Sequence, residues 1–177
     1  SDNKVIVRLP RQMGKTTTTA AFFLWYILFH DNKVCAILAN KAATAREILA
    51  RVKLAYEHLP LWLQQGVSAW NKGDIELENK CRILADSTAS SAARGYSISF
   101  LYLDEFAFVP NNVAEEFFTS VYPTISAGQT TKILLSSRET ATTDGSFKTT
   151  PLPGTKTKVL TVPKSMPNFL ERKAIPK

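Results

Sequence analysis

The sequence predicts an α/β domain with a central, mostly parallel sheet flanked by helices. Apolar runs of strand length alternate with longer segments of helical periodicity through residues 1–137. Polar turns follow the strand-like runs, and strands that are joined in this order by crossover helices form a parallel sheet. The 177 residues and the hydrophobic fraction of 45% suffice for one domain with its own core.

Two strand–helix pairs open the chain. Lys4–Leu9 is a short apolar strand, and Thr16–Phe29 is a helix that is apolar on all sides, which predicts that it is buried. Val34–Ala39 is a second apolar strand. Ala42–His58 is an amphipathic helix, because apolar residues recur at spacings of three and four with charged residues between them. The residues of its apolar face are Ala45, Ile48, Leu49, Val52 and Ala55.

The middle of the chain is predicted to form antiparallel hairpins over Val67–Asp86, with a turn at Asn71–Asp74. Further along we expect buried strands at Phe100–Leu103 and Lys132–Ser136, with a short helix at Ala114–Tyr122 between them. The hairpin residues expected to face the core are Ile75, Leu77, Ile83 and Leu84.

From Arg138 onward the hydrophobic periodicity ends. Residues 138–177 are rich in Thr, Pro, Lys and Gly, and they hold 8 basic and 3 acidic side chains of a chain whose net charge is +7. Prolines interrupt any long element there. We therefore divide the chain into a core over residues 1–137 and an irregular basic tail over 138–177, loop or disordered, with at most one strand at Lys158–Val162.

Composition excludes several classes of function. Cys35 and Cys81 lie in apolar runs, which indicates buried, reduced thiols and not a disulfide framework. Two histidines without ligand spacing exclude a zinc site. The apolar run Ala20–Phe29 is too short to span a bilayer and follows no signal peptide, so we expect a cytosolic protein with no membrane partner. The tryptophans expected to pack in the core or hairpin are Trp25, Trp62 and Trp70.

The segment Leu9–Thr17 has the features of a phosphate-binding loop. It follows a strand and opens a helix, where backbone N–H groups and the helix N-terminus face an anion. We expect Lys15 to contact the β- and γ-phosphates of ATP and the Thr16 hydroxyl to hold Mg²⁺. The first glycine of the usual pattern is replaced by Leu9, so this segment alone leaves an ordinary strand–turn–helix as an equal alternative. The residues expected at the phosphates are Arg11, Gln12, Met13, Gly14, Lys15, Thr16 and Thr17.

A second motif, Phe100–Glu105, consists of four apolar residues followed by two carboxylates. Such a pair at the exit of a buried strand is costly unless a metal ion or a cation lies beside it. We expect Asp104 to bind Mg²⁺, directly or through water, and Glu105 to orient or deprotonate the attacking water. The alternative is a strand that simply ends in a polar turn. Because the Gly-Lys-Thr sequence precedes it, the two motifs together indicate a P-loop nucleotide hydrolase.

Two arginines are candidates for the positive charge that phosphoryl transfer needs in its transition state. Arg11 lies inside the phosphate loop and can reach the γ-phosphate of its own site. Arg94 lies on a loop before the acidic strand and can act in its own site or on a neighbouring subunit. Such arginines contribute roughly 10³–10⁵ in rate in other nucleotide hydrolases. A solvated loop charge is an equal alternative for Arg94.

The motifs together resemble the large terminase subunit of tailed bacteriophages, the DNA-packaging motor, in its myovirus-like form. The phosphate loop of that family places an arginine early and dispenses with the first glycine, as this chain does. The resemblance extends over about residues 4–137, with several motifs in the same order. The segments that carry it are Arg11–Thr17, Ile37–Lys41, Trp70–Leu77, Ala93–Ser97, Tyr102–Pro110, Tyr122–Gly128 and Lys132–Ser137.

The resemblance implies an additional-strand P-loop ATPase fold, Mg²⁺-dependent ATP hydrolysis, and translocation of double-stranded DNA into a procapsid. It implies the small terminase subunit and the portal protein as partners, a homo-oligomeric ring when assembled, and a place in the host cytoplasm at the procapsid. Ser136 and Ser137 would begin the coupling motif, which senses the γ-phosphate and transmits hydrolysis to DNA movement.

The chain departs from the family pattern in three places. Arg138–Ala141 follows the coupling strand where the family continues with a Ser/Thr-rich stretch. The upstream adenine-binding region and a following nuclease domain are not included, so we expect a partial ATPase core, and we hypothesise that residues 138–177 have diverged or left the original reading frame. A helicase-like nucleic-acid ATPase and a nucleotide-binding fragment without turnover stay open as alternatives.

Overall fold

The structure is a computed structural model, and it describes residues 4–9, 14–88, 95–105, 117, 119, 131–138 and 158–161, with backbone only at 4–9, 137, 138 and 158–161. Its helices are α1 (Lys15–Phe29) and α2 (Ala42–Glu57). Its strands are β1 (Lys4–Leu9), β2 (Val34–Ala39), β3 (Val67–Asn71), β4 (Asp74–Leu77), β5 (Arg82–Ser87), β6 (Ile98–Asp104), β7 (Lys132–Arg138) and β8 (Lys158–Thr161).

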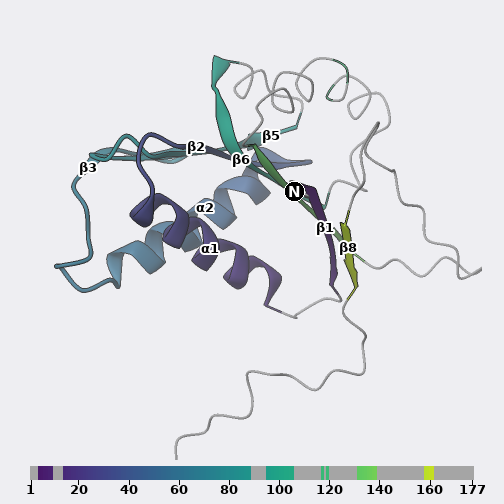
Figure 1. Cartoon of the computed structure of the whole chain (residues 1–177), viewed down its shortest axis with the longest axis horizontal. Helices are drawn as coiled ribbons and strands as arrows, with labels where there is room; N and C mark the ends of the chain where they lie inside the picture. The colour runs from purple at the N-terminus through teal and green to yellow at the C-terminus, as the bar shows by residue number, and fades with distance from the viewer. Residues whose placement is uncertain are drawn as a thin grey trace, which may run out of the picture.

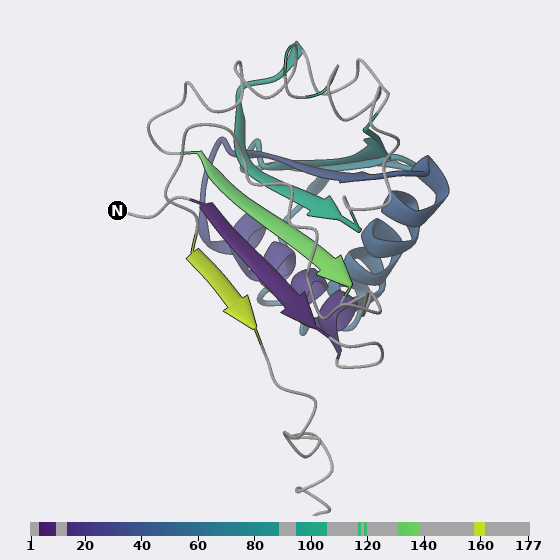
Figure 2. The ribbon, with the colours of Figure 1, turned by 90° about the vertical axis from the view of Figure 1, so that its right-hand side faces the viewer.

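The strands form one sheet in the order β3-β4-β5-β2-β6-β7-β1-β8. The neighbours within β3–β5 are antiparallel, and the other neighbouring pairs are parallel. Figure 2 shows β6, β7, β1 and β8 side by side and running in the same direction. β7 lies between β1, which leads toward the first helix, and β6, which ends in the acidic pair. This inserted strand confirms the expected additional-strand arrangement and the mostly parallel sheet.

Both described helices lie on the same face of the sheet and pack against each other (Figure 1). The apolar core fills the space between these helices and β2, β4, β5 and β6. Helix α2 buries the face that its periodicity predicts, except that Ala55 is half-buried and Tyr56 takes the inward position in the last turn. The buried residues of α2 are Ala45, Ile48, Leu49, Val52 and Tyr56.

The prediction that the first helix is buried on all sides is wrong. Trp25 is 49% exposed and Phe29 is 62% exposed on the outer side of α1. Trp62, which was expected to pack, is 82% exposed, whereas Trp70 packs on Tyr56 with 5.7 Å between ring centroids. A helix that covers a sheet buries only the face toward the sheet, and apolar residues on its other side do not indicate what covers them.

The hairpin over residues 67–87 forms as predicted and also joins the main sheet. β3 and β4 pair around the turn at Asn71–Asp74, and β4 pairs with β5. Along its other edge β5 pairs with β2 in parallel, which local periodicity did not predict. Ile83 is buried, but Leu84 is only half-buried, because neighbouring residues of a strand point to opposite faces. Ala85 takes the inward position instead.

The described part of the tail is a strand at the edge of the sheet. β8 lies parallel to β1, with Val159 opposite Ile6, which confirms the strand predicted at Lys158–Val162 to within one residue. The helix predicted at Ala114–Tyr122 lies outside the described residues, except for Phe117 and Thr119. The division of the chain at residue 137 stays a prediction. No helix among the described residues has the length and apolarity that a membrane span requires.

The two cysteines are buried and free, as the sequence predicts. Burial raises the pKa of the Cys35 thiol and of the Cys81 thiol above the ordinary value. Both side chains are therefore neutral at pH 7 and pack as small groups of the core, and the Cys81 thiol also donates to the His30 carbonyl at 3.0 Å.

Candidate active site

The site begins at the first turn of α1. Gly14 precedes the helix with φ 72°, a left-handed conformation that glycine adopts without steric cost. Its carbonyl accepts the first helical hydrogen bond from the Thr18 N–H at 2.9 Å. Glycine has no side chain to cap the helix, and the first turn holds no acidic residue. The free N–H groups and the positive end of the helix dipole are therefore suited to an anion.

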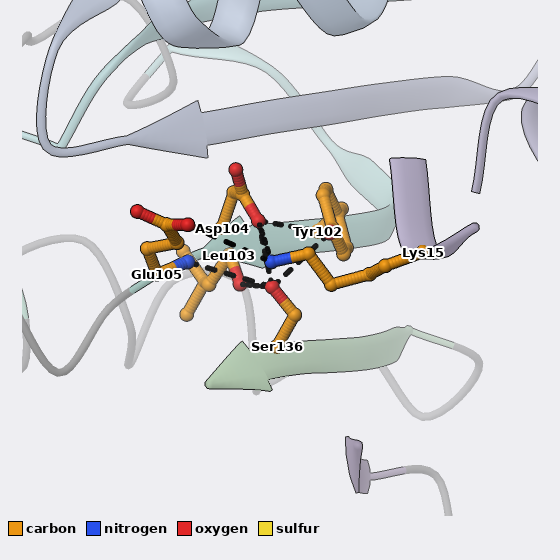
Figure 3. A network of polar contacts seen from close by, with 6 residues as sticks. All are labelled: Lys15, Tyr102, Leu103, Asp104, Glu105 and Ser136. Atoms are coloured by element: carbon orange, nitrogen blue, oxygen red, sulfur yellow. Dashed lines mark hydrogen bonds and ion pairs between the residues drawn. The ribbon is translucent and has the colours of Figure 1, made fainter. Parts of the chain in front are cut away.

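The acidic pair lies at the carboxyl end of β6. Asp104 is the last residue of the strand and is 5% exposed. Glu105 follows it with φ 50°, a left-handed conformation that is uncommon for a residue with a side chain. The strand is therefore interrupted directly after Asp104, and the two adjacent carboxylates leave it in different directions, as Figure 3 shows.

A polar network joins these two elements to β7 (Figure 3). The Lys15 Nζ lies 2.9 Å from Asp104 Oδ1 and 3.9 Å from Glu105 Oε1. The Ser136 hydroxyl donates to Asp104 Oδ1 at 2.7 Å, and the Tyr102 hydroxyl lies 3.0 Å from the same oxygen and 3.1 Å from Ser136 Oγ. One carboxylate oxygen therefore lies within hydrogen-bonding distance of three donors, which replace the water that a buried carboxylate has lost.

The packing of α1 on β6 explains why these side chains meet. Side chains two apart on a strand share a face, and side chains about one turn apart on a helix share a side. Lys15 contacts Asp104 at the site, and one turn further along the helix the Thr19 side chain lies close to the Tyr102 hydroxyl. Aromatic rings hold the two elements together beyond that point. The ring contacts are Phe22–Phe100, Phe23–Phe100, Phe23–Tyr102 and Tyr26–Phe100.

The register between β6 and β7 places Ser136 in the site. Asp104 lies opposite Ser136 in the parallel pairing of β6 with β7, and Ser137 lies opposite Arg8 of β1. Ser136 is 1% exposed, and its Oγ also lies 3.4 Å from the Glu105 backbone nitrogen. The carboxyl ends of neighbouring parallel strands thus bring the expected coupling residue against the expected metal ligand.

The structure brings together four of the residues that the sequence singled out, namely Lys15, Asp104, Glu105 and Ser136. Thr16 and Thr17 follow Lys15 in the first turn of α1, the former half-buried and the latter exposed. The sequence analysis missed Tyr102, whose hydroxyl lies inside the network. The predicted site residues that lie outside the described part are Arg11, Gln12, Met13 and Arg94.

The oxygen ligands at this edge fit a magnesium nucleotide. Mg²⁺ prefers oxygen and is usually held by one or two protein groups together with phosphates and water. The Asp104 carboxylate and the Thr16 hydroxyl are groups of this kind. Within the described ranges there is no cluster of three or more His, Cys, Asp or Glu residues that could hold a metal ion.

The inserted strand, the Gly-Lys-Thr sequence before a helix and the acidic pair on β6 define the additional-strand class of P-loop nucleotide-hydrolase folds. Within this class the chain belongs to the family of terminase large subunits, T4likevirus-type, N-terminal part, which it matches over residues 6–145. The match covers most of the chain and continues past residue 137. It bears out the resemblance seen in the motifs.

Solved structures support the fold. The large terminase of the HK97 bacteriophage superimposes with a TM-score of 0.63 at 19% identity, covering 76% of this chain and 29% of that one. The large terminase ATPase domain of Thermus phage P74-26 gives 0.63 at 15% identity, over 91% of this chain and 76% of that domain. A large terminase from a thermophilic bacteriophage, solved in complex with ATP-gamma-S, gives 0.54 at 12% identity over 77% and 32%. The chain therefore spans about a third or less of the full-length terminases that it matches.

Proposed function

We propose that this chain is the ATP-hydrolysing motor domain of a DNA-packaging terminase. The observation that carries the proposal is the contact of Lys15 with Asp104 at 2.9 Å, at the N-terminus of α1 and beside Glu105. A cation, two carboxylates and a helix N-terminus that meet at one edge of a parallel sheet are the parts that phosphoryl transfer requires. Family membership, and the names of similar proteins as an ATPase domain and as an ATP-gamma-S complex, support the same activity.

In this proposal the first turn of α1 binds the phosphates. The backbone N–H groups that follow Gly14 bind the phosphate oxygens, and Lys15 contacts the β- and γ-phosphates as a point charge. Thr16 and Asp104 would hold Mg²⁺, which would supply positive charge against the charge that develops on the phosphates. Because Lys15 lies against both carboxylates, it exchanges these partners for phosphate oxygens when ATP binds.

Glu105 is the proposed base for the attacking water. Its carboxylate lies 3.9 Å from the Lys15 Nζ, on the same side of the site as the phosphates that Lys15 would bind. Arg11 and Arg94 are the proposed sources of positive charge in the transition state. Ser136 and Ser137 are the proposed start of the coupling segment. The hydrogen bond from Ser136 to Asp104 at 2.7 Å supports this role, because a movement of the Asp104 carboxylate would also move Ser136 on β7.

The whole-protein activity is proposed on family membership. The substrate that the assembled motor moves is double-stranded DNA, which enters a procapsid. The partners are the small terminase subunit, the portal protein and further copies of the large subunit in a ring, in the host cytoplasm. The motif order and the family match over residues 6–145 favour this assignment over a helicase-like ATPase.

Steady-state ATP hydrolysis by the purified 177-residue chain with Mg²⁺ tests the proposal. Lys15→Ala and Glu105→Gln should each lower the rate by at least about 100-fold, because one removes a phosphate contact and the other the base. Lys72→Ala, in the exposed turn between β3 and β4, is the matched lysine control and should leave the rate unchanged.

The same three variants separate the alternatives. ATP binding that depends on Lys15, without hydrolysis, would replace the motor function with a nucleotide-binding fragment that lacks turnover. Hydrolysis that survives Lys15→Ala and Glu105→Gln would exclude this site as its source. Neither binding nor hydrolysis by the unmodified chain would overturn the proposed function.

A further inference from the structure

Tyr102 has a hydroxyl where three elements of the structure meet. The residue lies on β6, the strand between β2 and β7, and is 1% exposed. Its hydroxyl lies 3.0 Å from Asp104 Oδ1 and 3.1 Å from Ser136 Oγ, and the Thr19 side chain of α1 lies close to it. A phenylalanine would provide the same ring contact with Phe23, whose centroid lies 6.3 Å away, so packing does not account for the hydroxyl.

The Tyr102 hydroxyl donates its hydrogen bond to the Asp104 carboxylate. A protonated phenol is a hydrogen-bond donor, and the nearest charged acceptor is Asp104 Oδ1. This donor and the Ser136 hydroxyl both stay on Oδ1 when Lys15 turns toward a phosphate. The carboxylate then keeps two of its three donors.

These hydrogen bonds determine the orientation of the Asp104 carboxylate. Lys15, Tyr102 and Ser136 all contact Oδ1, while the other carboxylate oxygen points away from these three groups (Figure 3). Two donors on one oxygen, supplied by different strands, fix the rotation of a carboxylate about its last bond more firmly than one donor does. Residues behind a metal ligand that act in this way commonly change metal affinity or activity by roughly 10–100-fold when they are removed.

We propose that Tyr102 is a positioning residue for the metal-binding carboxylate. Its hydroxyl holds Asp104 by Oδ1, so that Oδ2 is presented to the magnesium ion of the bound nucleotide. Tyr102 acts through Asp104 and is buried behind it. The contact with Thr19 joins this carboxylate to the helix that carries Lys15 and Thr16, so the two halves of the phosphate site keep their spacing. This inference rests on the proposed function.

Tyr102→Phe tests the inference, because it removes the hydroxyl and keeps the ring. We expect the Mg²⁺ concentration for half-maximal hydrolysis to rise roughly 10-fold or more, with a lower kcat. The second readout is binding of the fluorescent analogue mant-ATP in Mg²⁺ and in EDTA. The affinity in EDTA should be unchanged, and the gain in affinity on adding Mg²⁺ should shrink by a similar factor.

Tyr56→Phe is the matched control. Tyr56 is also buried and donates its hydroxyl to the Gln65 carbonyl, so the variant loses one tyrosine hydrogen bond remote from the site. It should keep the magnesium dependence of the unmodified chain. Thr19→Val is a second route to the same hydroxyl if Tyr102→Phe does not fold, and it should shift the magnesium dependence in the same direction by a smaller factor.

The outcomes separate the two levels of inference. An unmodified chain that hydrolyses ATP, with the same magnesium dependence in Tyr102→Phe and Thr19→Val as in Tyr56→Phe, overturns the positioning role and leaves the proposed function intact. Equal loss of mant-ATP affinity in Mg²⁺ and in EDTA also overturns it, since that result means a general distortion of the site. An unmodified chain that neither binds nor hydrolyses ATP overturns the proposed function and this inference with it.

Discussion

The two ends of α1 carry polar clusters of opposite character. At its N-terminus Lys15 lies against the carboxylates of Asp104 and Glu105, so the cluster is charged. At its C-terminus the cluster is neutral. There the Asn79 amide donates to the Ile27 and His30 carbonyls at 2.7 and 2.9 Å, and its oxygen accepts the Cys81 N–H at 3.0 Å. The helix has 15 residues, so about 22 Å separates the two clusters.

The difference shows which cluster serves the fold. Asn79 gives the last carbonyls of α1 the partners that a helix end needs, and it ties the helix to the turn between β4 and β5. Each of its contacts is to the backbone, so it would serve in any sequence with this fold. The charged cluster gathers side chains whose ionisation matters, next to a left-handed Glu105. Such an arrangement costs stability, and under the proposed function it is retained for chemistry.

Asp104→Asn gives the largest expected effect of this comparison. Asparagine keeps the size of the side chain and can still accept from Ser136 and Tyr102, but it removes the negative charge that binds Mg²⁺. We expect ATP hydrolysis per folded molecule to fall by at least about 100-fold. The free energy of unfolding should also fall, by about 1–3 kcal/mol, because Lys15 loses its charged partner at 2.9 Å in a largely buried place. Hydrolysis assays and urea denaturation measure the two quantities.

Asp74→Asn is the matched control for that variant. Asp74 pairs with Arg82 at 2.8 Å in the hairpin, so the same change breaks a partly buried ion pair away from the site. It should lower stability and leave hydrolysis unchanged. Equal kinetic loss in both variants would contradict the assignment of Asp104 as the metal ligand.

Asn79→Ala should give the reverse pattern. The change removes the side-chain partner of the Ile27 carbonyl and of the Cys81 N–H, and it leaves the His30 carbonyl with the Cys81 thiol as a side-chain donor, at 3.0 Å. An unsatisfied buried polar group costs roughly 1 kcal/mol or more. We expect the free energy of unfolding to fall by about 2–4 kcal/mol with no change in the rate per folded molecule. Urea denaturation is the measurement, and Asn40→Ala, at an exposed position after β2, is the control. A loss of stability no larger than that of the control would contradict the structural role of Asn79.

The sequence predicts most of the parallel part of the fold. The predicted first helix, Thr16–Phe29, begins one residue from the observed bound, and the predicted second helix, Ala42–His58, ends one residue from it. Local periodicity and the glycine before α1 carry this information. The parallel pairing of β5 with β2 is a contact between distant segments, which local patterns do not contain. The exposure of Trp25 and Trp62 was missed for a related reason, since apolar character does not state what covers a residue.

The candidate site could be predicted in part. Lys15 opens a helix, and Asp104 and Ser136 lie near the carboxyl ends of their strands. The edge where parallel strands end brings such residues together. Tyr102 was missed because a tyrosine inside an apolar strand is expected to be a core residue. A signal for it does exist, since Tyr102 and Asp104 are two apart on one strand and must share a face. Tyr102 could have been found by asking which polar side chains lie two residues from Asp104 on the same strand.

Glu105→Gly should give the smallest effect on stability and sharpens the comparison most. A residue with a side chain loses about 1–2 kcal/mol of stability in the left-handed conformation, and glycine avoids this cost. Part of the gain is lost again, because glycine makes the unfolded chain more flexible. We expect the free energy of unfolding to rise by about 0.5–1 kcal/mol while hydrolysis falls at least about 100-fold. Lys80→Gly is the matched control, because Lys80 also has a positive φ, 63°, in the turn at the neutral end of α1.

Lys80→Gly should gain similar stability and keep its activity, as urea denaturation and hydrolysis assays of both variants would show. Stabilisation in both variants with loss of hydrolysis in one means that the same backbone strain is incidental in a turn and is kept for function beside Asp104. If Glu105→Gly instead destabilises the chain, the Glu105 side chain contributes more to the fold than its 3.9 Å contact with Lys15 indicates, and the charged cluster would then be structural as well.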